Sequence, residues 1–397
     1  MIRSSHTAGP LAGLKVVDLT SVISGPGAMG ILCDQGADVI KVEPVTGDIM
    51  RSRGTRPEFT PGFVSCNRGK KSIVLDLKKD DAKAILWQLV ESADVFAQNF
   101  RPGVAERLGF GAEEALQRNP RLVYLSISGV GETGPYVKKR VYDPVVQALS
   151  GIAEIQAEPS TGRPRMIRTL VADKTTAIYA AQAVMSALYS REQTGKGQHV
   201  RVSMLDTMIS YLWTEGMAQY SLVGEEDQAT PTTAHDMIFP TRDGYVTIGA
   251  VSDAEWRALC TAMQRPELVD DPRFATPGAR NSNRQERMAV TEEALRELTT
   301  AALLEVLEAA DVPCAPVLSR LEMLEDRQVV NNEIVHVIDQ PGLGKLRQAR
   351  AAAHFDGTPC GPVRTAPGLG EHSDMILAEL GLDQTGISAL RDGGSIK

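Results

Sequence analysis

The sequence predicts an α/β protein with a doubly wound parallel sheet, and two observations carry that prediction. Short apolar runs rich in β-branched residues alternate in the first half of the chain with segments of helical periodicity. Parallel strands need helical crossovers, so this order is typical of a Rossmann-like sheet covered by helices on both faces. The chain of 397 residues is also long enough for a second domain, which we expect to be a smaller α+β domain.

The first unit of this pattern lies near the start of the chain. Residues 14–20 (LKVVDLT) predict a buried strand, and SGPGAMG follows at 24–30 before a helical stretch that runs to Asp34. Residues 36–44 predict the second strand. Strand, glycine-rich turn, helix and strand in this order indicate a parallel βαβ unit.

The alternation of strands and helices continues beyond this unit. The next elements that we expect are a strand at 72–77, an amphipathic helix at 80–93, strands at 94–100 and 121–129, and an alanine-rich helix at 173–192. A glycine-rich loop through Gly134 follows the strand at 121–129.

The chain changes character near 222–235, where polar and turn-forming residues gather. Beyond this point Asp243-Gly244 lies between two strand-like runs and predicts a hairpin. Helices are expected at 252–264, at 286–310 and within 372–390. We therefore expect a large domain over 1–222, completed by 345–397, a small domain over 235–320, and linkers at 223–234 and 321–344.

The composition argues against several classes of function. A net charge of −8 makes a general nucleic-acid surface improbable, because duplex binding normally needs a basic footprint. No run approaches 18 apolar residues, so we expect no membrane partner. The six histidines show no metal-binding spacing, and the five scattered cysteines favour a reduced, cytoplasmic protein.

The first candidate motif is GPGAMG, at residues 25–30. It fits the pattern G-x-G-x-x-G of dinucleotide-binding turns, and Glu43 stands where such proteins place the acidic residue that binds the ribose. A plain strand-to-helix turn explains the same letters, so the motif leaves both readings open. The first of them is an NAD-dependent dehydrogenase.

Three polar segments are candidates for binding an anionic ligand. Cations at a strand entrance or beyond a strand end can hold phosphates by charge-assisted hydrogen bonds, and a flat phenylalanine can stack on a base. Each segment alone is equally well explained as a solvated turn or a helix start. The residues concerned are Asn67 to Lys71, Asn99 to Gly103 with Arg107, and Arg140 to Asp143.

Asp173 is the candidate for covalent chemistry. It comes just before an alanine-rich helix, where an aspartate is usually an N-cap. The N-terminal end of a helix stabilises a carboxylate and would also stabilise an oxyanion beside it. Capping and catalysis are therefore both open from the residues alone.

Taken together, these segments resemble the family III CoA-transferases, the group that contains formyl-CoA transferase and carnitine CoA-transferase. The order and spacing of the segments along nearly the whole chain is more specific than any one of them. The resemblance is carried by VVDLTSVISGPGAMGILCDQGADVIKVEP, NRGKKSIVLDLK, NFRPGVAERLGFG, the block from Tyr142 to Leu205 with QALSG and TGKGQHVRVSMLDT, and the later DPRF and ADVPCAPV.

The resemblance implies a function and a set of site residues. It implies transfer of CoA from an acyl-CoA donor to a carboxylic acid, through an aspartyl-CoA thioester on Asp173. It also implies an interlocked homodimer, with acyl-CoA as substrate and no metal or tightly bound cofactor. Pro44 departs from members that carry an arginine there, which puts one nucleotide contact in doubt. The implied CoA-binding residues are Ile23, Ser24, Arg68, Gly69, Lys70, Lys71, Asn99, Phe100, Arg101, Arg107, Arg140, Val141, Tyr142 and Asp143.

An acyl-CoA racemase or epimerase is the nearest alternative, because the α-methylacyl-CoA racemases resemble the same fold. They use a histidine–aspartate pair, and this chain has Tyr142 where the histidine is expected. Tyrosine is a poor base near neutral pH, with an ordinary pKa of about 10. The sequence therefore favours transfer over racemisation.

Overall fold

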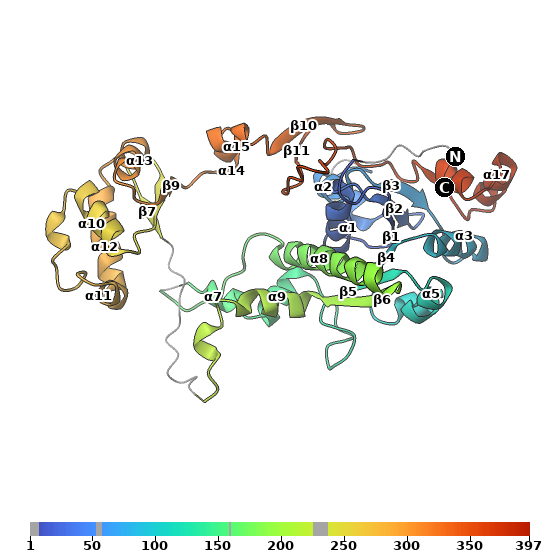
Figure 1. The fold of residues 1–397 in the computed structure, drawn as a ribbon, viewed down its shortest axis with the longest axis horizontal. Helices are drawn as coiled ribbons and strands as arrows, with labels where there is room; N and C mark the ends of the chain where they lie inside the picture. Colours follow the sequence, from blue (N-terminus) through green and yellow to red (C-terminus); the bar gives the residue numbers. More distant parts are fainter. Residues whose placement is uncertain (1–7, 53–57, 159, 225–236) are drawn as a thin grey trace. The chain divides into compact units, whose positions relative to one another are not determined.

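The computed structural model describes residues 8–52, 58–158, 160–224 and 237–397, and within them six parallel strands form a central sheet (Figure 1). The strand order is β3-β2-β1-β4-β5-β6, which is the doubly wound order and confirms the predicted α/β class. The strands are β1 (Lys15–Asp18), β2 (Asp38–Glu43), β3 (Lys71–Val74), β4 (Val95–Gln98), β5 (Val123–Ser128) and β6 (Gln198–Ser203).

Alternate residues of the strands point to opposite faces of this sheet, so it has a core on each side. Val16 and Val95 pack with helices α1 (Ser24–Asp34) and α8 (Val171–Thr194) on one face. Their neighbours Val17 and Phe96 pack with α3 (Asp80–Glu91) on the other. Helices on both faces explain why the central strands are apolar on both sides.

Strand β6 is an element that the sequence analysis did not predict. It pairs in parallel with β5, from Val123 opposite Gln198 to Ser128 opposite Ser203. Its sequence QHVRVS lies at the edge of the sheet and is mostly half-buried or exposed. A polar edge strand lacks the apolar run by which a buried strand is recognised.

The C-terminal segment packs against the same sheet. Ile376 of α16 (Ser373–Glu379) and Ile387 of α17 (Gln384–Asp392) belong to the core cluster that contains Val17. Ile396 forms an isolated antiparallel bridge with Leu75. The last 25 or so residues therefore close one face of the sheet.

By compactness, the chain divides into a main unit, residues 1–233 with 333–397, and a small unit, residues 234–332. This division does not test the predicted domain limits at 222, 235, 320 and 345, which stay predictions. Most of the predicted linker at 223–234 lies outside the described residues. The other predicted linker, 321–344, contains short helices and most of a β-hairpin.

The small unit contains a three-stranded antiparallel sheet of order β7-β8-β9. The turn at Asp243-Gly244 joins β7 (Ile238–Pro240) to β8 (Tyr245–Ile248), as the sequence predicts. The range 286–310, where the sequence predicts helical structure, is occupied mainly by two helices, Arg284–Leu295 and Thr300–Ala309. Thr299 caps the second of them by accepting a hydrogen bond from the N–H of Ala302.

The remaining elements are mostly short. They are α2 (Pro61–Asn67), α4 (Val104–Leu108), α5 (Ala112–Arg118), α6 (Asp143–Leu149), α7 (Ile152–Ile155), α9 (Met204–Trp213), α10 (Asp253–Ala262), α11 (Pro277–Ser282), α12 (Arg284–Leu295), α13 (Thr300–Ala309), α14 (Arg320–Met323), α15 (Arg327–Asn331), β9 (Cys314–Pro316), β10 (Val335–Gln340), β11 (Gly344–Ala349) and the 3-10 helices Ile49–Arg51, Ala218–Tyr220 and Pro266–Leu268. No helix in the described part of the chain is long and apolar enough to cross a membrane.

Candidate active site

A solvent-open pocket of about 280 Å³ lies at the carboxyl ends of the central strands. The chain reverses its direction of winding between β1 and β4, and doubly wound proteins bind ligands at that point. The pocket is lined by Ser21, Val22, Ser24, residues 99–102, residues 127–131, Val137, residues 139–142, Asp173 and Met204.

Asp173 is buried to 8% exposure and lies in the first turn of α8, two residues after the helix begins. The expected N-cap role is therefore wrong. Leu170 occupies the cap position and makes no side-chain capping bond. The carboxylate of Asp143 instead accepts the N–H groups of Ala172 and Asp173, at 2.7 and 3.1 Å. Asp143 caps the helix, which leaves the carboxylate of Asp173 to face the pocket.

Burial raises the pKa of the Asp173 carboxyl to about 6, and the negative charge of Asp143 adds to this effect. Ser24, whose hydroxyl and backbone N–H can donate to the carboxylate, acts in the opposite direction and lowers this pKa. Desolvation disfavours the charged form, while donors to the carboxylate favour it. At neutral pH the group is mainly ionised and incompletely solvated, as suits a nucleophile.

The glycines of GPGAMG serve helix packing. The sequence predicts a glycine-rich turn at residues 24–30, but helix α1 begins at Ser24 and contains all three glycines. A Cβ atom at Gly25 would lie 2.3 Å from the Cβ of Thr20, and one at Gly27 would lie 3.2 Å from the Cβ of Ala177. A Cβ at Gly30 would lie 2.9 Å from a backbone oxygen of the neighbouring helix α2. Close approach of helices accounts for the motif.

Glu43, the acidic residue that the nicotinamide alternative requires, is bound by other side chains in this structure. Glu43 is buried, and both of its oxygens accept hydrogen bonds from Arg51 at 2.7 Å. Ser72 also donates to it, at 2.8 Å. A carboxylate held in this way is not available to a ribose in the pocket.

The pocket brings together residues from two of the three predicted polar segments with Ser24 and Asp173. Asn99, after β4, is hydrogen-bonded to Ser21, after β1. Its amide N–H donates to the carbonyl oxygen of Ser21 and its amide oxygen accepts the N–H of Ser21, both at 2.8 Å. Tyr142 is half exposed at the pocket wall. The predicted residues that line the pocket are Ser24, Asn99, Phe100, Arg101, Arg140, Val141, Tyr142 and Asp173.

Other predicted ligand-binding residues lie outside the pocket lining. Ile23 and Asp143 adjoin it, and Asp143 acts through the α8 backbone. Arg107 lies on α4, beyond the lining residue Pro102, and is exposed. The contribution of these residues to CoA binding stays a prediction.

Lys70 is a structural cation in this arrangement. Its side chain is fully buried, and its ammonium group lies 2.8 Å from Asp18. The same ammonium donates to the carbonyl oxygen of Pro26 at 2.9 Å and to Asn67 at 3.0 Å. With these partners Lys70 is fixed in the core below α1.

The neighbouring predicted residues are also engaged. Arg68 forms a paired contact with Asp34, with an Nε–Oδ1 distance of 3.0 Å, and Lys71 lies 2.9 Å from Asp38. Gly69 has a positive φ of 75° and packs against the guanidinium of Arg364. Burial and ion pairs of this kind were not evident from a run of cations in the sequence.

Sequence reasoning missed two parts of the site. Lys139 lines the pocket next to the predicted Arg140, and its place in the basic run 138–140 is a signal that could have found it. Gly129 and Gly131, in the loop after β5, also line the pocket. No cluster of three His, Cys, Asp or Glu side chains that could hold a metal occurs in the described residues.

Comparison with known proteins shows the family of the chain. The profile of CoA-transferase family III matches residues 11–373. The chain belongs to CoA-transferase family III. It is 36% identical to succinyl-CoA:mesaconate CoA-transferase of Haloarcula marismortui, over 94% of this chain and 97% of the relative. It is 33% identical to human succinyl-CoA:glutarate CoA-transferase, over 98% and 90%.

A solved structure agrees in fold as well. A CAIB/BAIF family protein from Brucella suis superposes with a TM-score of 0.82 at 33% identity, over 94% of this chain and all of the other. The predicted family and the predicted class of enzyme are confirmed. This family III CoA-transferase uses CoA thioesters as its substrates.

Proposed function

We propose that the enzyme transfers CoA through a covalent thioester on Asp173. The ionised carboxylate attacks the carbonyl carbon of the donor acyl-CoA, and the CoA thiolate leaves as a mixed anhydride forms. The thiolate then attacks the carbonyl carbon of Asp173, which releases the donor acid as a carboxylate. The product of this half-reaction is aspartyl-CoA.

The second half-reaction reverses these steps with another acid. The acceptor carboxylate attacks the aspartyl thioester, and the thiolate leaves again. The thiolate then attacks the acceptor's carbonyl carbon in the new anhydride, which forms the product acyl-CoA and restores Asp173. The energy of the thioester is conserved throughout, so the proposal needs no metal and no tightly bound cofactor.

One observation carries this proposal: the position of the Asp173 carboxylate. It is buried, it lines the open pocket, and it lies in the first turn of α8. Ser24, the first residue of α1, lines the same pocket and lowers the pKa of this carboxyl. Hydroxyl and backbone N–H donors at the start of a helix can stabilise the oxyanions of both tetrahedral steps.

We further propose that CoA enters along the predicted segments and that the acceptor is a dicarboxylic acid. Arg101, Lys139 and Arg140 line the pocket, whereas Asp173 is the one carboxylate among its lining residues in the described part of the chain. This positive surplus suits phosphates and a second carboxylate. The two named relatives act on mesaconate and glutarate, which are both dicarboxylates.

Trapping the intermediate tests the mechanism. Enzyme mixed with succinyl-CoA and quenched in acid should carry CoA on the peptide that contains Asp173, as measured by mass spectrometry. Asp173→Ala and Asp173→Asn should lose the adduct and about 10³-fold or more of the transfer rate, because they remove the nucleophile.

Two results would contradict this proposal. Near-normal transfer by Asp173→Asn, or an adduct on another residue, would remove Asp173 from the mechanism. Exchange of the α-hydrogen of an acyl-CoA for deuterium without CoA transfer would instead support the racemase or epimerase alternative.

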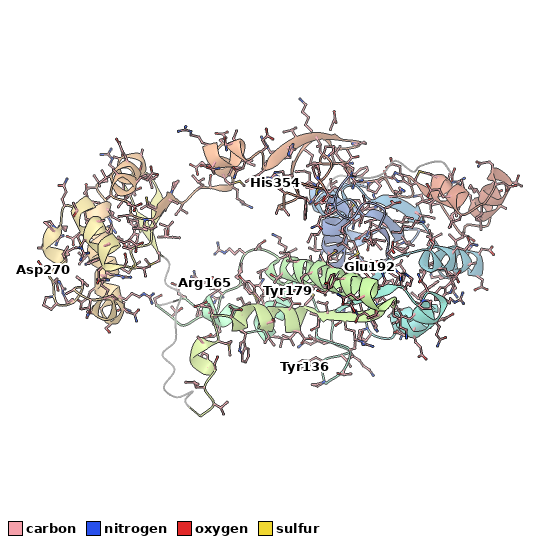
Figure 2. All side chains as sticks on the ribbon, in the orientation of Figure 1. Tyr136, Arg165, Tyr179, Glu192, Asp270 and His354 are labelled. Carbon is pink, nitrogen blue, oxygen red and sulfur yellow. The ribbon has the colours of Figure 1, made fainter. Side chains whose placement is uncertain are left out.

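We also propose that the protein acts as an interlocked homodimer in the cytoplasm. Apolar side chains lie exposed on α8 and α9, where Figure 2 labels Tyr179. An exposed apolar patch on folded elements is a feature of protein–protein interfaces. All five cysteines are free, which suits a reducing compartment. The exposed residues concerned are Ile178, Tyr179, Tyr189, Ile209, Tyr211 and Trp213.

A further inference from the structure

The turn at residues 20–23, between β1 and α1, has a backbone conformation that is unfavourable by itself. Neighbouring groups must therefore stabilise it. Val22 has a φ of 73°, which lies in the left-handed region. A β-branched residue rarely adopts this conformation, and it persists only where neighbouring structure determines it. The turn leads directly to Ser24, the first residue of α1, which lines the same pocket as Asp173 and lowers the pKa of its carboxyl.

Buried charged groups bind the backbone of this turn. Asp18 accepts the N–H of Thr20 at 2.9 Å and also bonds its hydroxyl. The ammonium of Lys41 donates to the carbonyl oxygen of Thr20 at 2.9 Å. The carboxylate of Asp48 lies 3.4 Å from the N–H of Val22.

Asp48 and Lys41 act as a pair. Their charged atoms are 3.0 Å apart, and both side chains are 1% exposed. The other oxygen of Asp48, Oδ1, accepts the N–H of Met50 at 2.9 Å as well as that of Val22, and the bond to Met50 fixes the orientation of the carboxylate. Buried ion pairs often stabilise a fold no better than apolar residues of the same size. This pair bonds to the backbone of the strained turn at Thr20 and at Val22, and it can therefore fix the conformation of that turn.

We propose that Asp48, together with Lys41, is a positioning residue for CoA transfer, which holds the turn at residues 20–23 so that Ser24 meets the Asp173 carboxylate. The inference rests on the proposed role of Asp173 as nucleophile. Asp48 itself does not line the pocket, so it acts through the Val22 backbone.

The pH dependence of the reaction reports on the position of Ser24 relative to the Asp173 carboxylate. Asp143 of α6 and Ser24 of α1 act on the pKa of Asp173. The other charged or titratable side chains that line its pocket are Arg101, Lys139, Arg140 and Tyr142. Ser24 lowers the pKa of Asp173. Loss of the Ser24 contact therefore raises this pKa, and activity at the acid side should fall at a higher pH.

The test compares Asp48→Ala with a matched control, Asp94→Ala. Asp94 also accepts one backbone N–H, from Lys15 at 2.9 Å, and forms an ion pair with Arg191 at 2.9 Å, but it lies away from the pocket. Asp48→Ala should lower kcat about 10- to 100-fold, because small misplacements of reacting groups are this costly. Its KM for acyl-CoA should stay within about threefold, and the acid limb of its pH–rate profile should move upward.

Conservative variants keep the test decisive. Asp48→Asn retains an oxygen that accepts the Val22 N–H and should recover most of the lost rate. If Asp48→Ala does not melt cooperatively, Asp48→Ser, whose side chain is too short to reach Val22, should show the same loss and the same shift. An unshifted acid limb in the folded variants, or an equal shift in Asp94→Ala, overturns the inference.

Failure of the proposed function gives a different result. If Asp173→Asn retains transfer activity, Asp173 is not the nucleophile, whatever Asp48→Ala does. If Asp173→Asn is inactive and Asp48→Ala resembles the wild type in kcat and pH profile, the positioning role alone is wrong.

Discussion

Single residues decide how the stability of this enzyme depends on pH, and Asp173 is the clearest case. Its carboxyl has an ordinary pKa of 3.8 and one of about 6 in the folded chain. The folded state therefore binds this proton more tightly than the unfolded chain does. As pH rises from 3.8 to about 6, ionisation of the buried group costs the fold stability, and above that range the cost is complete.

The Asp173→Asn variant should therefore be more stable than the wild type at neutral pH although it is inactive. We expect a gain of up to about 3 kcal/mol in the free energy of unfolding at pH 7.5, and a gain near zero at pH 4. Urea denaturation at both values measures it. Asp206→Asn, at an exposed carboxylate on α9, should change stability by less than about 0.5 kcal/mol. A gain that does not depend on pH would contradict the raised pKa.

The sequence predicted part of the site at this scale. Asp173 was predicted as the nucleophile because it heads an alanine-rich helix within a recognised family pattern, and that role stays a prediction. Its cap, Asp143, was predicted only as a ligand-binding residue, since a bond to a backbone 29 residues away leaves no mark in the sequence. Lys70 was predicted to bind phosphate because cations in a run look alike, whether they are solvated or buried.

At the scale of elements, helix α1 decides the geometry of the pocket. Its first turn contains Gly25, Pro26 and Gly27, which are residues that normally end helices. Proline is tolerated there because the first N–H groups of a helix have no partner within it. The glycines are required because Thr20 and Ala177 lie so close. Propensity therefore predicts a loop, and tertiary packing makes a helix.

Gly25→Ala tests this account of α1. The new Cβ would meet the Thr20 side chain at 2.3 Å, so the helix or the turn at residues 20–23 must move. We expect a loss of about 1–3 kcal/mol in stability and a lower kcat. Gly278→Ala is the control, because no atom lies within 4 Å of its Cβ position in α11. The control should be neutral or slightly stabilising. Equal effects of the two variants in thermal melts would contradict the packing argument.

Over the whole molecule, contacts distant in the sequence complete what local patterns begin. The alternation of apolar runs predicts the parallel sheet, but not that Ile396 would pair with Leu75. Nor does it predict that β10 and β11 would form a hairpin within a range that looks like a linker. The bridge between Leu75 and Ile396 spans hundreds of residues and depends on the assembled fold, which a local pattern does not contain.

The exposed apolar faces of α8 and α9 provide the last prediction, at the level of assembly. Ile178 and Tyr189 are 61% and 70% exposed on a helix that is otherwise packed on the sheet. A second copy of the chain would bury them, which stabilises association by roughly 25 cal/mol per Å² of apolar area. Light scattering coupled to gel filtration should therefore give twice the mass of one chain.

The double substitution Ile178→Glu with Tyr189→Glu should shift the mass toward one chain, because a charge within an apolar interface stays unpaired. Tyr245→Glu, at a side chain of the small unit that is 56% exposed, should leave the mass unchanged. A monomeric wild type would refute the homodimer, and a dimer that survives the double substitution would place its interface elsewhere. Because the predicted interface includes α8, whose first turn contains the proposed nucleophile Asp173, the dissociated variant should also lose transfer activity.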